Sequence, residues 1–284
     1  MSPGSAAADT VRILDRNSDA LQARFSMIDH ASHSIELAYY SVDDSTVSRE
    51  IFARLVQAAN RGVCVRVIVD ACFNYLSGSR MRELMACGIE FREYHSPRWL
   101  NPTRTVCRLH DKLLIADDYA VILGGRNVED HYFGVGQSQL FRDRDIWVTG
   151  KAAQHSAEYF EQIWNSGRVG PVPDTTAKAL FQHLHEPPRF KHIKRLSDEL
   201  IRCGCAGKDR LFGSQEPRLS CSNPMPRNVP VEGVEELSAH HTVPEGYVKF
   251  LHSSKVAPKE TDITDDLLKL IDSAQYRIVI ETPY

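Results

Sequence analysis

The chain lacks a strong net charge and a long apolar run. Its 284 residues include 34 Lys and Arg and 37 Asp and Glu, a formal net charge of −3. This balance gives no overall electrostatic reason to expect binding to nucleic acid. No apolar run approaches the about 18 residues that span a bilayer, and residues 1–9 lack the layout of a secretion signal. We therefore expect a protein without its own membrane anchor, most simply a cytoplasmic one.

Cysteine is present but in an odd number and at scattered positions, which argues against a disulfide framework and for a reducing compartment. Four of the seven cysteines lie in or beside apolar segments and are interpreted as small core residues: Cys64, Cys72, Cys87 and Cys107. The others, with nearby histidines, match no standard zinc finger or ribbon spacing: Cys203, Cys205 and Cys221. The sequence therefore predicts no metal site.

Strand and helix patterns alternate from residue 11 onward. Apolar residues at helical spacing predict helices over 18–27, 49–60 and 79–86. Apolar and β-branched runs predict strands over 35–40, 63–69 and 89–94, and a further strand and helix over 145–149 and 151–165. This rhythm indicates an α/β fold with a largely parallel sheet covered by helices.

The stretch 108–127 carries the densest set of reactive side chains. His110 and Lys112 lie two residues apart on a predicted strand, so both side chains leave the same face. A second predicted strand ends in Gly124 and Gly125, where the backbone can approach a ligand closely, and Asn127 follows. These groups suit a phosphate, because lysine and asparagine can hold anionic oxygens while histidine attacks phosphorus.

Each piece of this pattern alone is common, since most His-x-Lys pairs are solvated strand residues and most Gly-Gly pairs are turns. The joint spacing His-x-Lys-x4-Asp-x6-Gly-Gly-x-Asn, however, resembles the signature of the phospholipase D superfamily. That family more often has Gly-Ser, whereas Gly-Gly-Arg-Asn is typical of its bacterial cardiolipin-synthase-like branch. The phrases Tyr-Phe-Gly at 132–134, Phe-Arg-Asp-x-Asp at 141–145 and Ile-Trp-Asn-Ser at 163–166 extend the resemblance, which covers about 11–167.

The resemblance implies a phospholipase D-like α-β-α sandwich and a two-step displacement without metal or other cofactor. His110 would form a covalent phosphohistidine, and a second histidine would protonate the leaving alcohol. The phosphate oxygens would be bound by Lys112, Gly124, Gly125 and Asn127. Asp145, with Asp143 in reserve, is expected to orient the His110 ring, whereas Asp117, the acid of the motif, is expected to support the turn that follows the first motif strand.

A second pattern indicates an internal repeat. Residues 267–284 align with 24–41 with four identities, and the family is built from two such halves, each contributing one histidine to a shared cleft. We therefore expect a flexible N-terminus (1–10), a first phospholipase D-like domain (11–170), a connecting region (171–245) and the start of a second, incomplete domain (246–284). The second histidine would come from sequence beyond residue 284 or from a dimer partner.

The residues of the motifs Gly-Gly-Arg-Asn and Phe-Arg-Asp-x-Asp favour a phosphatidyltransferase that makes cardiolipin-like lipids. Its partners would be an anionic glycerophospholipid and a lipid alcohol acceptor, reached by peripheral contact with the inner face of the membrane. Two alternatives stay open: a phosphodiesterase that hydrolyses phospholipid or nucleic acid, and an inactive binding fragment. Nucleic acid is the less favoured substrate because the net charge is −3.

Overall fold

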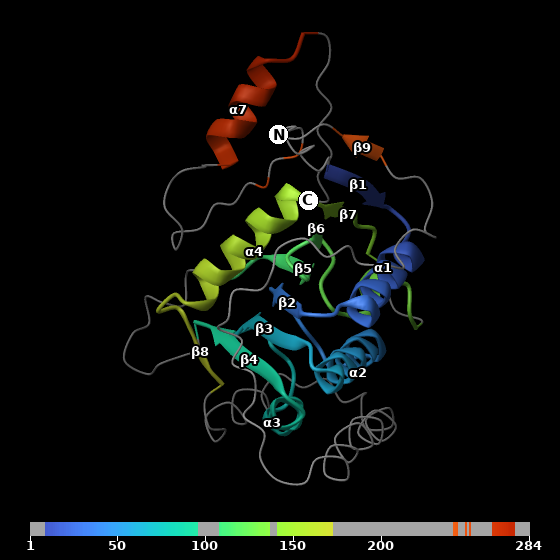
Figure 1. Cartoon of the computed structure of the whole chain (residues 1–284), viewed down its shortest axis with the longest axis vertical. Helices are drawn as coiled ribbons and strands as arrows, with labels where there is room; N and C mark the ends of the chain where they lie inside the picture. Colours follow the sequence, from blue (N-terminus) through green and yellow to red (C-terminus); the bar gives the residue numbers. More distant parts are fainter. Residues whose placement is uncertain are drawn as a thin grey trace, which may run out of the picture.

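The computed structural model describes residues 9–95, 108–136, 141–172, 241–243, 248, 250 and 263–275. Nine strands are described: β1 (Asp9–Leu14), β2 (Ser34–Tyr39), β3 (Cys64–Asp70), β4 (Ile89–Tyr94), β5 (Lys112–Ala116), β6 (Ala120–Gly124), β7 (Asp145–Thr149), β8 (Val169–Pro171) and β9 (His241–Val243). The helices are α1 (Asn17–His30), α2 (Thr46–Arg61), α3 (Gly78–Ala86), α4 (Lys151–Trp164) and α7 (Ile263–Asp272), with a short 3₁₀ turn, η2 (Asp130–Tyr132). The strands form one sheet in the order β8-β4-β3-β2-β5-β6-β7-β1-β9 (Figure 1).

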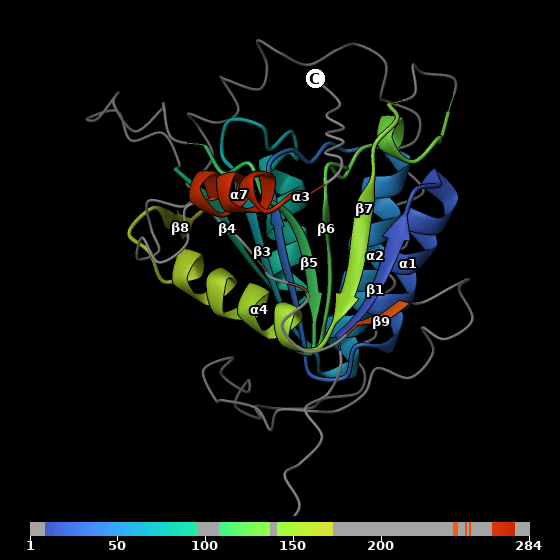
Figure 2. The same ribbon diagram turned by 90° about the horizontal axis from the view of Figure 1, so that it is seen from above.

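Helices cover both faces of the sheet, as Figure 2 shows, with α1 and α2 on one side and α4 on the other. Residues of α1, α2 and α3 pack in one core with inward residues of the strands, for example Ile51 of α2 and Val67 of β3. Residues of α4 pack in a second core on the opposite face, for example Phe160 with Ile68. The expected α-β-α sandwich with a mixed sheet is therefore confirmed.

The balance of strand directions differs from the prediction. Among the described strands, only the pairs β2–β3 and β3–β4 run parallel, and every other pairing is antiparallel. The expectation of a largely parallel sheet was therefore wrong. The reason is that β5, β6 and β7 follow one another in the chain and lie side by side as an antiparallel meander, and β5 also runs antiparallel to β2.

One edge of the sheet collects the ends of seven strands. The carboxyl ends of β1, β2, β3, β4 and β6 meet the amino ends of β5 and β7 there, as the pairs Tyr39–Lys112, Gly124–Asp145 and Leu14–Asp145 show. Every residue of the predicted motif except Asp117 lies at or near this edge. The strand order therefore brings the motif together, although its residues come from several segments.

The predicted helices and strands between 18 and 165 are all present, with ends that shift by a few residues. Three strands were not predicted: β1, β8 and β9. Strand β1 begins inside the segment expected to be flexible, and β9 pairs with it from inside the expected connecting region. In the aligned repeat, the residues that correspond to β2 (277–282) lie outside the described residues, whereas α7 overlaps the residues that correspond to the end of α1.

The cysteines require a correction. Cys64 and Cys87 are disulfide-bonded, not free core residues. Cys64 begins β3, and Cys87 ends α3 just before β4, whose Ile89 pairs with Val65, so the two lie at adjacent strand starts. Cys72 is free and exposed. The remaining cysteines lie outside the described residues.

None of the described helices has the length and the apolar character that crossing a membrane requires.

Candidate active site

His110 and Lys112 lie together where β5 begins. Lys112 is paired with Tyr39 of β2, and its Nζ lies 3.5 Å from His110 Nε2 and donates to the His110 carbonyl oxygen at 3.0 Å. The His110 ring also contacts Tyr40, with 4.6 Å between ring centroids. Lys112 is 6% exposed, whereas His110 is open to solvent. The pair thus presents a reachable imidazole with a nearly buried cation beside it, as the spacing of two residues predicts.

The environment of this pair favours a neutral imidazole. Burial, and then the positive charge of Lys112, lower the pKa of His110 below its ordinary value. Burial also lowers the pKa of Lys112, while nearby carboxylates, first of all Asp111, oppose that shift. A neutral ring nitrogen has the free lone pair that a nucleophile needs.

Asn127 follows β6 and is held at both ends of its amide. Its Oδ1 accepts from the Ser41 backbone N–H at 3.3 Å, and its Nδ2 donates to the Tyr132 hydroxyl at 3.1 Å. The side chain is buried. An amide nitrogen carries two hydrogens, so the bond to Tyr132 uses one of them. Asn127 is therefore fixed in place at the same edge of the sheet as Lys112.

The two glycines of the motif make room for carboxylates. A Cβ atom on Gly124 would lie 2.6 Å from both the Arg144 carbonyl oxygen and Asp145 Cα and would collide with the Asp145 carboxylate. A Cβ atom on Gly125 would collide with the Asp143 carboxylate. The sequence suggested close approach of a ligand at these positions. In the structure, the close approach is made by Asp143 and Asp145.

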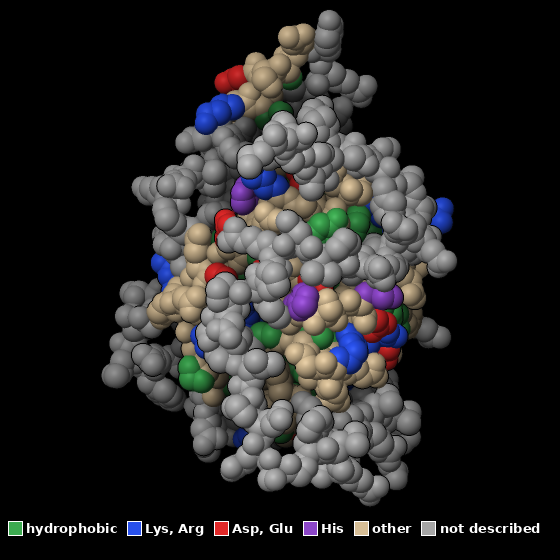
Figure 3. Space-filling view, viewed as in Figure 1, with side chains coloured by type: hydrophobic (Ala, Val, Ile, Leu, Met, Phe, Trp, Pro, Cys, Tyr) green, Lys and Arg blue, Asp and Glu red, His purple; other side chains and the backbone are tan. Residues whose placement is uncertain are grey.

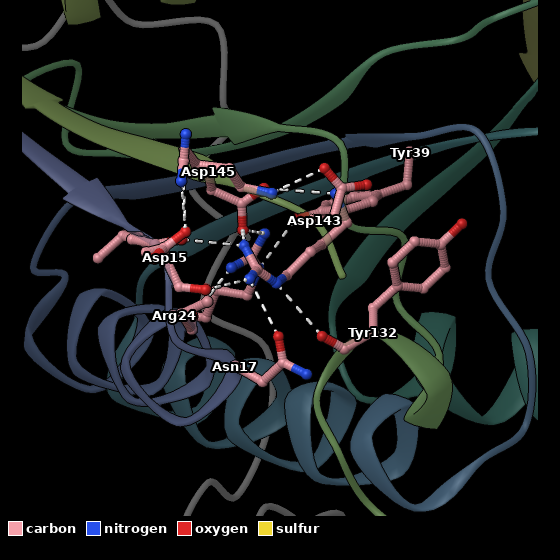
Figure 4. Close-up of polar contacts among 11 residues, drawn as sticks. Asp15, Asn17, Arg24, Tyr39, Tyr132, Asp143 and Asp145 are labelled. Atoms are coloured by element: carbon pink, nitrogen blue, oxygen red, sulfur yellow. Dashed lines mark hydrogen bonds and ion pairs between the residues drawn. The ribbon is translucent and has the colours of Figure 1, made fainter. Parts of the chain in front are cut away.

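Asp145 does not have the partner that was predicted for it. Its Oδ2 accepts from Arg24 Nη2 at 2.9 Å and from Arg126 Nη1 at 3.1 Å, and its Oδ1 accepts from the Arg126 backbone N–H at 3.3 Å (Figure 4). Arg24 also donates from Nε to the Tyr39 hydroxyl at 3.3 Å. Because two arginines occupy this carboxylate, the prediction that Asp145 orients the His110 ring is wrong, and Asp145 has a structural role beneath the site.

Arg126 is a residue that the sequence reasoning missed. Its guanidinium is fully buried and donates to the Leu14 and Asp15 carbonyl oxygens and to Asn17 Oδ1, each at 3.0 Å. Its Nε also donates to the Tyr132 carbonyl oxygen at 3.2 Å. These bonds fasten the loop that carries Asn127 to the segment between β1 and α1. The only sequence signal was its position inside the Gly-Gly-Arg-Asn phrase.

Asp117 lies at the opposite edge of the sheet, in the turn between β5 and β6. Its carboxylate accepts from the backbone N–H groups of Ser32 at 3.0 Å, His33 at 2.7 Å and Ser34 at 2.9 Å. The structure thus gives this residue the supporting position that the sequence indicated, away from the reactive pair. Asp143, the reserve candidate, lies beside Gly125, and its Oδ1 accepts from the Arg144 backbone N–H at 2.7 Å.

The chain is similar to known proteins over this same region. Residues 25–164 match a family model described as cardiolipin synthase, PLD-like domain. Cardiolipin synthase C of Escherichia coli is 32% identical over 169 residues, which are 56% of this chain and 36% of that protein. A cardiolipin synthase of a Geobacillus species is 31% identical over 166 residues, 57% of this chain and 33% of that protein. The chain thus spans about a third of the length of these relatives.

Two solved structures are similar as well. Nuc of Salmonella typhimurium, a phospholipase D family member, is 24% identical with a TM-score of 0.45, over 58% of this chain and 99% of that one. The phosphatidylserine synthase of Haemophilus influenzae is 17% identical with a TM-score of 0.47, over 69% of this chain and 43% of that one.

The sandwich fold and the His-x-Lys pair at its sheet edge define a domain of the phospholipase D type. With the family match and the similarity to cardiolipin synthases, the chain belongs to the phospholipase D superfamily, in its cardiolipin-synthase-like branch.

Proposed function

We propose that the protein is a phosphatidyltransferase of the cardiolipin synthase type, acting on phospholipid phosphodiesters through a phosphohistidine. The observation that carries this proposal is the open His110 imidazole held beside the buried Lys112 ammonium. A phosphodiester docked on Lys112 would have its phosphorus next to a ring nitrogen whose pKa is lowered. Nucleophile and charge partner are thus assembled before any substrate arrives.

The reaction takes two balanced steps. In the first, a ring nitrogen of His110 bonds to phosphorus while the bond from phosphorus to the leaving alcohol oxygen breaks, and a general acid gives that oxygen a proton. In the second, the hydroxyl of an acceptor lipid loses its proton and attacks phosphorus, and the P–N bond breaks. Lys112 and Asn127 stabilise the charge that spreads over the non-reacting oxygens.

The general acid is proposed to be a second histidine from outside this half of the site. His110 is the only histidine of the chain in a His-x-Lys-x4-Asp frame. An in-line displacement needs acid and nucleophile on opposite sides of the phosphorus. A second phospholipase D-like half, or a second copy of the chain, would supply that group.

Peripheral contact with a membrane is part of the proposal, because the substrates are bilayer lipids. The side of the membrane is a separate matter. We propose the inner face, as the odd number of scattered cysteines suggested, and the disulfide bonding of Cys64 and Cys87 is the observation that weighs against that side.

Hydrolysis of a nucleic acid is the second candidate. On the face drawn in Figure 3, the described Lys and Arg side chains are scattered among acidic ones and form no continuous basic track. Together with the net charge of −3, this distribution favours a lipid over a polyanionic strand, which is normally held by clustered basic residues.

The experiment is product analysis with the full-length protein and vesicles of phosphatidylglycerol. Mass spectrometry is expected to show cardiolipin and released glycerol, and alkaline quenching is expected to trap phosphate on a peptide that contains His110. The variant His110→Ala serves as control and is expected to lose both signals. Release of phosphatidic acid alone would make the protein a hydrolase, and trapped phosphate in His110→Ala would overturn the assignment of the nucleophile.

A further inference from the structure

Asp111 separates the two reactive residues and turns to the other face of the sheet. Along β5, Leu114 and Ala116 belong to the core under α1 and α2, whereas Leu113 and Ile115 belong to the core under α4. Because side chains alternate along a strand, Asp111 falls on the α4 side and Lys112 on the opposite side. The Asp111 carboxylate therefore lies behind the reactive pair.

On that side, Asp111 meets a hydroxyl of α4. The Tyr159 hydroxyl donates to Asp111 Oδ2 at 2.9 Å. Tyr159 is 5% exposed, and its ring packs 5.5 Å from the Phe250 ring, centroid to centroid. The bond is therefore made in a largely apolar surrounding, where an unsatisfied carboxylate would be costly.

The backbone around Asp111 is fixed by further bonds. Its carbonyl oxygen accepts from the Tyr40 N–H at 2.9 Å, and the Leu109 N–H donates to Asp70 Oδ2 at 2.9 Å. Because the side chain of Asp111 is held as well, the segment from Leu109 to Lys112 is fixed through both its backbone and a side chain. Rotation of this segment would carry His110 and Lys112 out of their common position.

We propose that Asp111, held by the Tyr159 hydroxyl, is a positioning residue of the site: it sets the direction of the His110–Lys112 segment, and its negative charge keeps the buried Lys112 ammonium protonated. This inference rests on the proposed function only for its effect on the reaction rate. The interaction between the charges of Asp111 and Lys112 exists without substrate. It assigns a role to the middle residue of the His-x-Lys motif and to a tyrosine 48 positions away in the sequence.

The charges around Lys112 support this role. Burial is the largest effect on the Lys112 pKa and lowers it, and Asp111 is the largest of the opposing effects. The other carboxylates that raise this pKa come from the connection between β6 and β7 and from the start of β7: Asp143, Glu129 and Asp145. His110 and the Tyr40 ring also lie close to the Lys112 ammonium. Burial raises the pKa of Asp111 itself, and the bond from Tyr159 is the first effect that lowers it.

The two partners should therefore have separable effects. Without the Asp111 charge, burial of Lys112 is less well compensated, so the pKa of Lys112 falls. Without the Tyr159 hydroxyl, Asp111 binds a proton more readily, so the pKa of Asp111 rises.

The test compares two isosteric variants, Asp111→Asn and Tyr159→Phe, with the control Tyr119→Phe, which removes a hydroxyl from the turn at the opposite edge of the sheet. The pKa of the Lys112 ammonium is measured by NMR without substrate. It is expected to fall by about one unit in Asp111→Asn, as for the loss of one nearby charge, and to stay unchanged in the control. Tyr159→Phe keeps the charge and is expected to raise the pKa of the Asp111 carboxyl, which NMR also measures.

In Asp111→Asn, the alkaline limb of the pH profile of kcat/KM should move to lower pH by the same amount. An unchanged Lys112 pKa in folded Asp111→Asn overturns the proposal. If Asp111→Asn does not fold, Tyr159→Phe decides, because an unchanged pKa of the Asp111 carboxyl in that variant overturns the proposal. An inactive wild-type protein would contradict the proposed function, while the NMR measurement would still decide the role of Asp111.

Discussion

Arg126 and Asp145 form a buried pair joined twice, once through the Arg126 guanidinium at 3.1 Å and once through its backbone N–H at 3.3 Å. The two residues stand 19 positions apart, on the loop after β6 and at the start of β7. Arg24 of α1 completes the group, so a single carboxylate joins a helix, a strand and the motif loop.

The first prediction concerns this pair. Arg126→Met removes one of the two charges that compensate Asp145, whose carboxylate is fully shielded from solvent, together with the bonds of Arg126 to Leu14, Asp15 and Asn17. It should lower the free energy of unfolding by about 3–5 kcal/mol. Urea denaturation measures this loss. Arg144→Met is the control, because Arg144 pairs with Asp15 at the surface, where about 0–1 kcal/mol is expected. Equal effects in the two variants would contradict the structural role of the buried pair.

The second prediction concerns the motif aspartate. Asp117→Asn keeps a residue that tolerates the positive φ of 54° at this turn but weakens three backbone bonds. We expect a loss of about 1.5–3 kcal/mol in unfolding free energy, with kcat unchanged for the folded protein. Asp118→Asn is the control, because Asp118 is exposed in the same turn with a similar φ of 52°. A large fall in kcat without a loss of stability would instead make Asp117 part of the chemistry.

The third prediction concerns the second glycine of the motif. Gly125→Ala places a methyl group against the Asp143 carboxylate and should lower the free energy of unfolding by about 1–3 kcal/mol. The comparison is Gly167→Ala, since no atom lies within 4 Å of a Cβ there. Thermal or urea unfolding of both variants gives the difference, and a Gly125→Ala protein as stable as Gly167→Ala would show that Asp143 moves aside freely.

The fourth prediction concerns pH. Activity requires neutral His110, so the rate should fall as pH drops through the His110 pKa, which lies below the ordinary value of 6.5. The Lys112 charge contributes to that lowering, so Lys112→Gln should raise the His110 pKa. NMR titration of the His110 ring measures this directly, even if the variant is inactive. An unchanged or lower His110 pKa in Lys112→Gln would show that the two groups do not interact as the structure indicates.

Much of the fold follows from local pattern. In α2, Ile51, Phe52, Leu55 and Val56 stand at helical spacing, and all four are buried in the structure. The β-branched run of β3 likewise becomes a central strand. Such elements are readable because burial of their own side chains dictates their period.

Strand β1 was missed because its pattern is inverted. Ile13 is 60% exposed, whereas Asp9 and Arg12 are buried. Asp9 Oδ1 accepts from the Lys151 backbone N–H at 2.8 Å, at the start of α4. A polar residue that is buried to serve a distant backbone group leaves no periodic signal.

The candidate site was readable only in part, for a similar reason. His110 and Lys112 are near neighbours in sequence, so their shared position follows from strand geometry. One partner of Asp145 is Arg24, 121 positions away, and nothing in the surroundings of Arg24 in the sequence marks it as buried. Long-range ion pairs of this kind depend on strand order, which local patterns do not encode.

The hydrogen bonds from Arg126 to the carbonyl oxygens of Leu14 and Asp15 have a consequence for the design of shortened versions of the protein. The family match starts at residue 25, so a shortened version designed from it would discard β1 and the acceptors that hold Arg126. Such a product would keep His110, Lys112 and Asn127 yet leave a buried guanidinium without these acceptors under the loop that carries Asn127. A version that keeps β1 and these acceptors has to start at or before Asp9, well upstream of the recognisable motif.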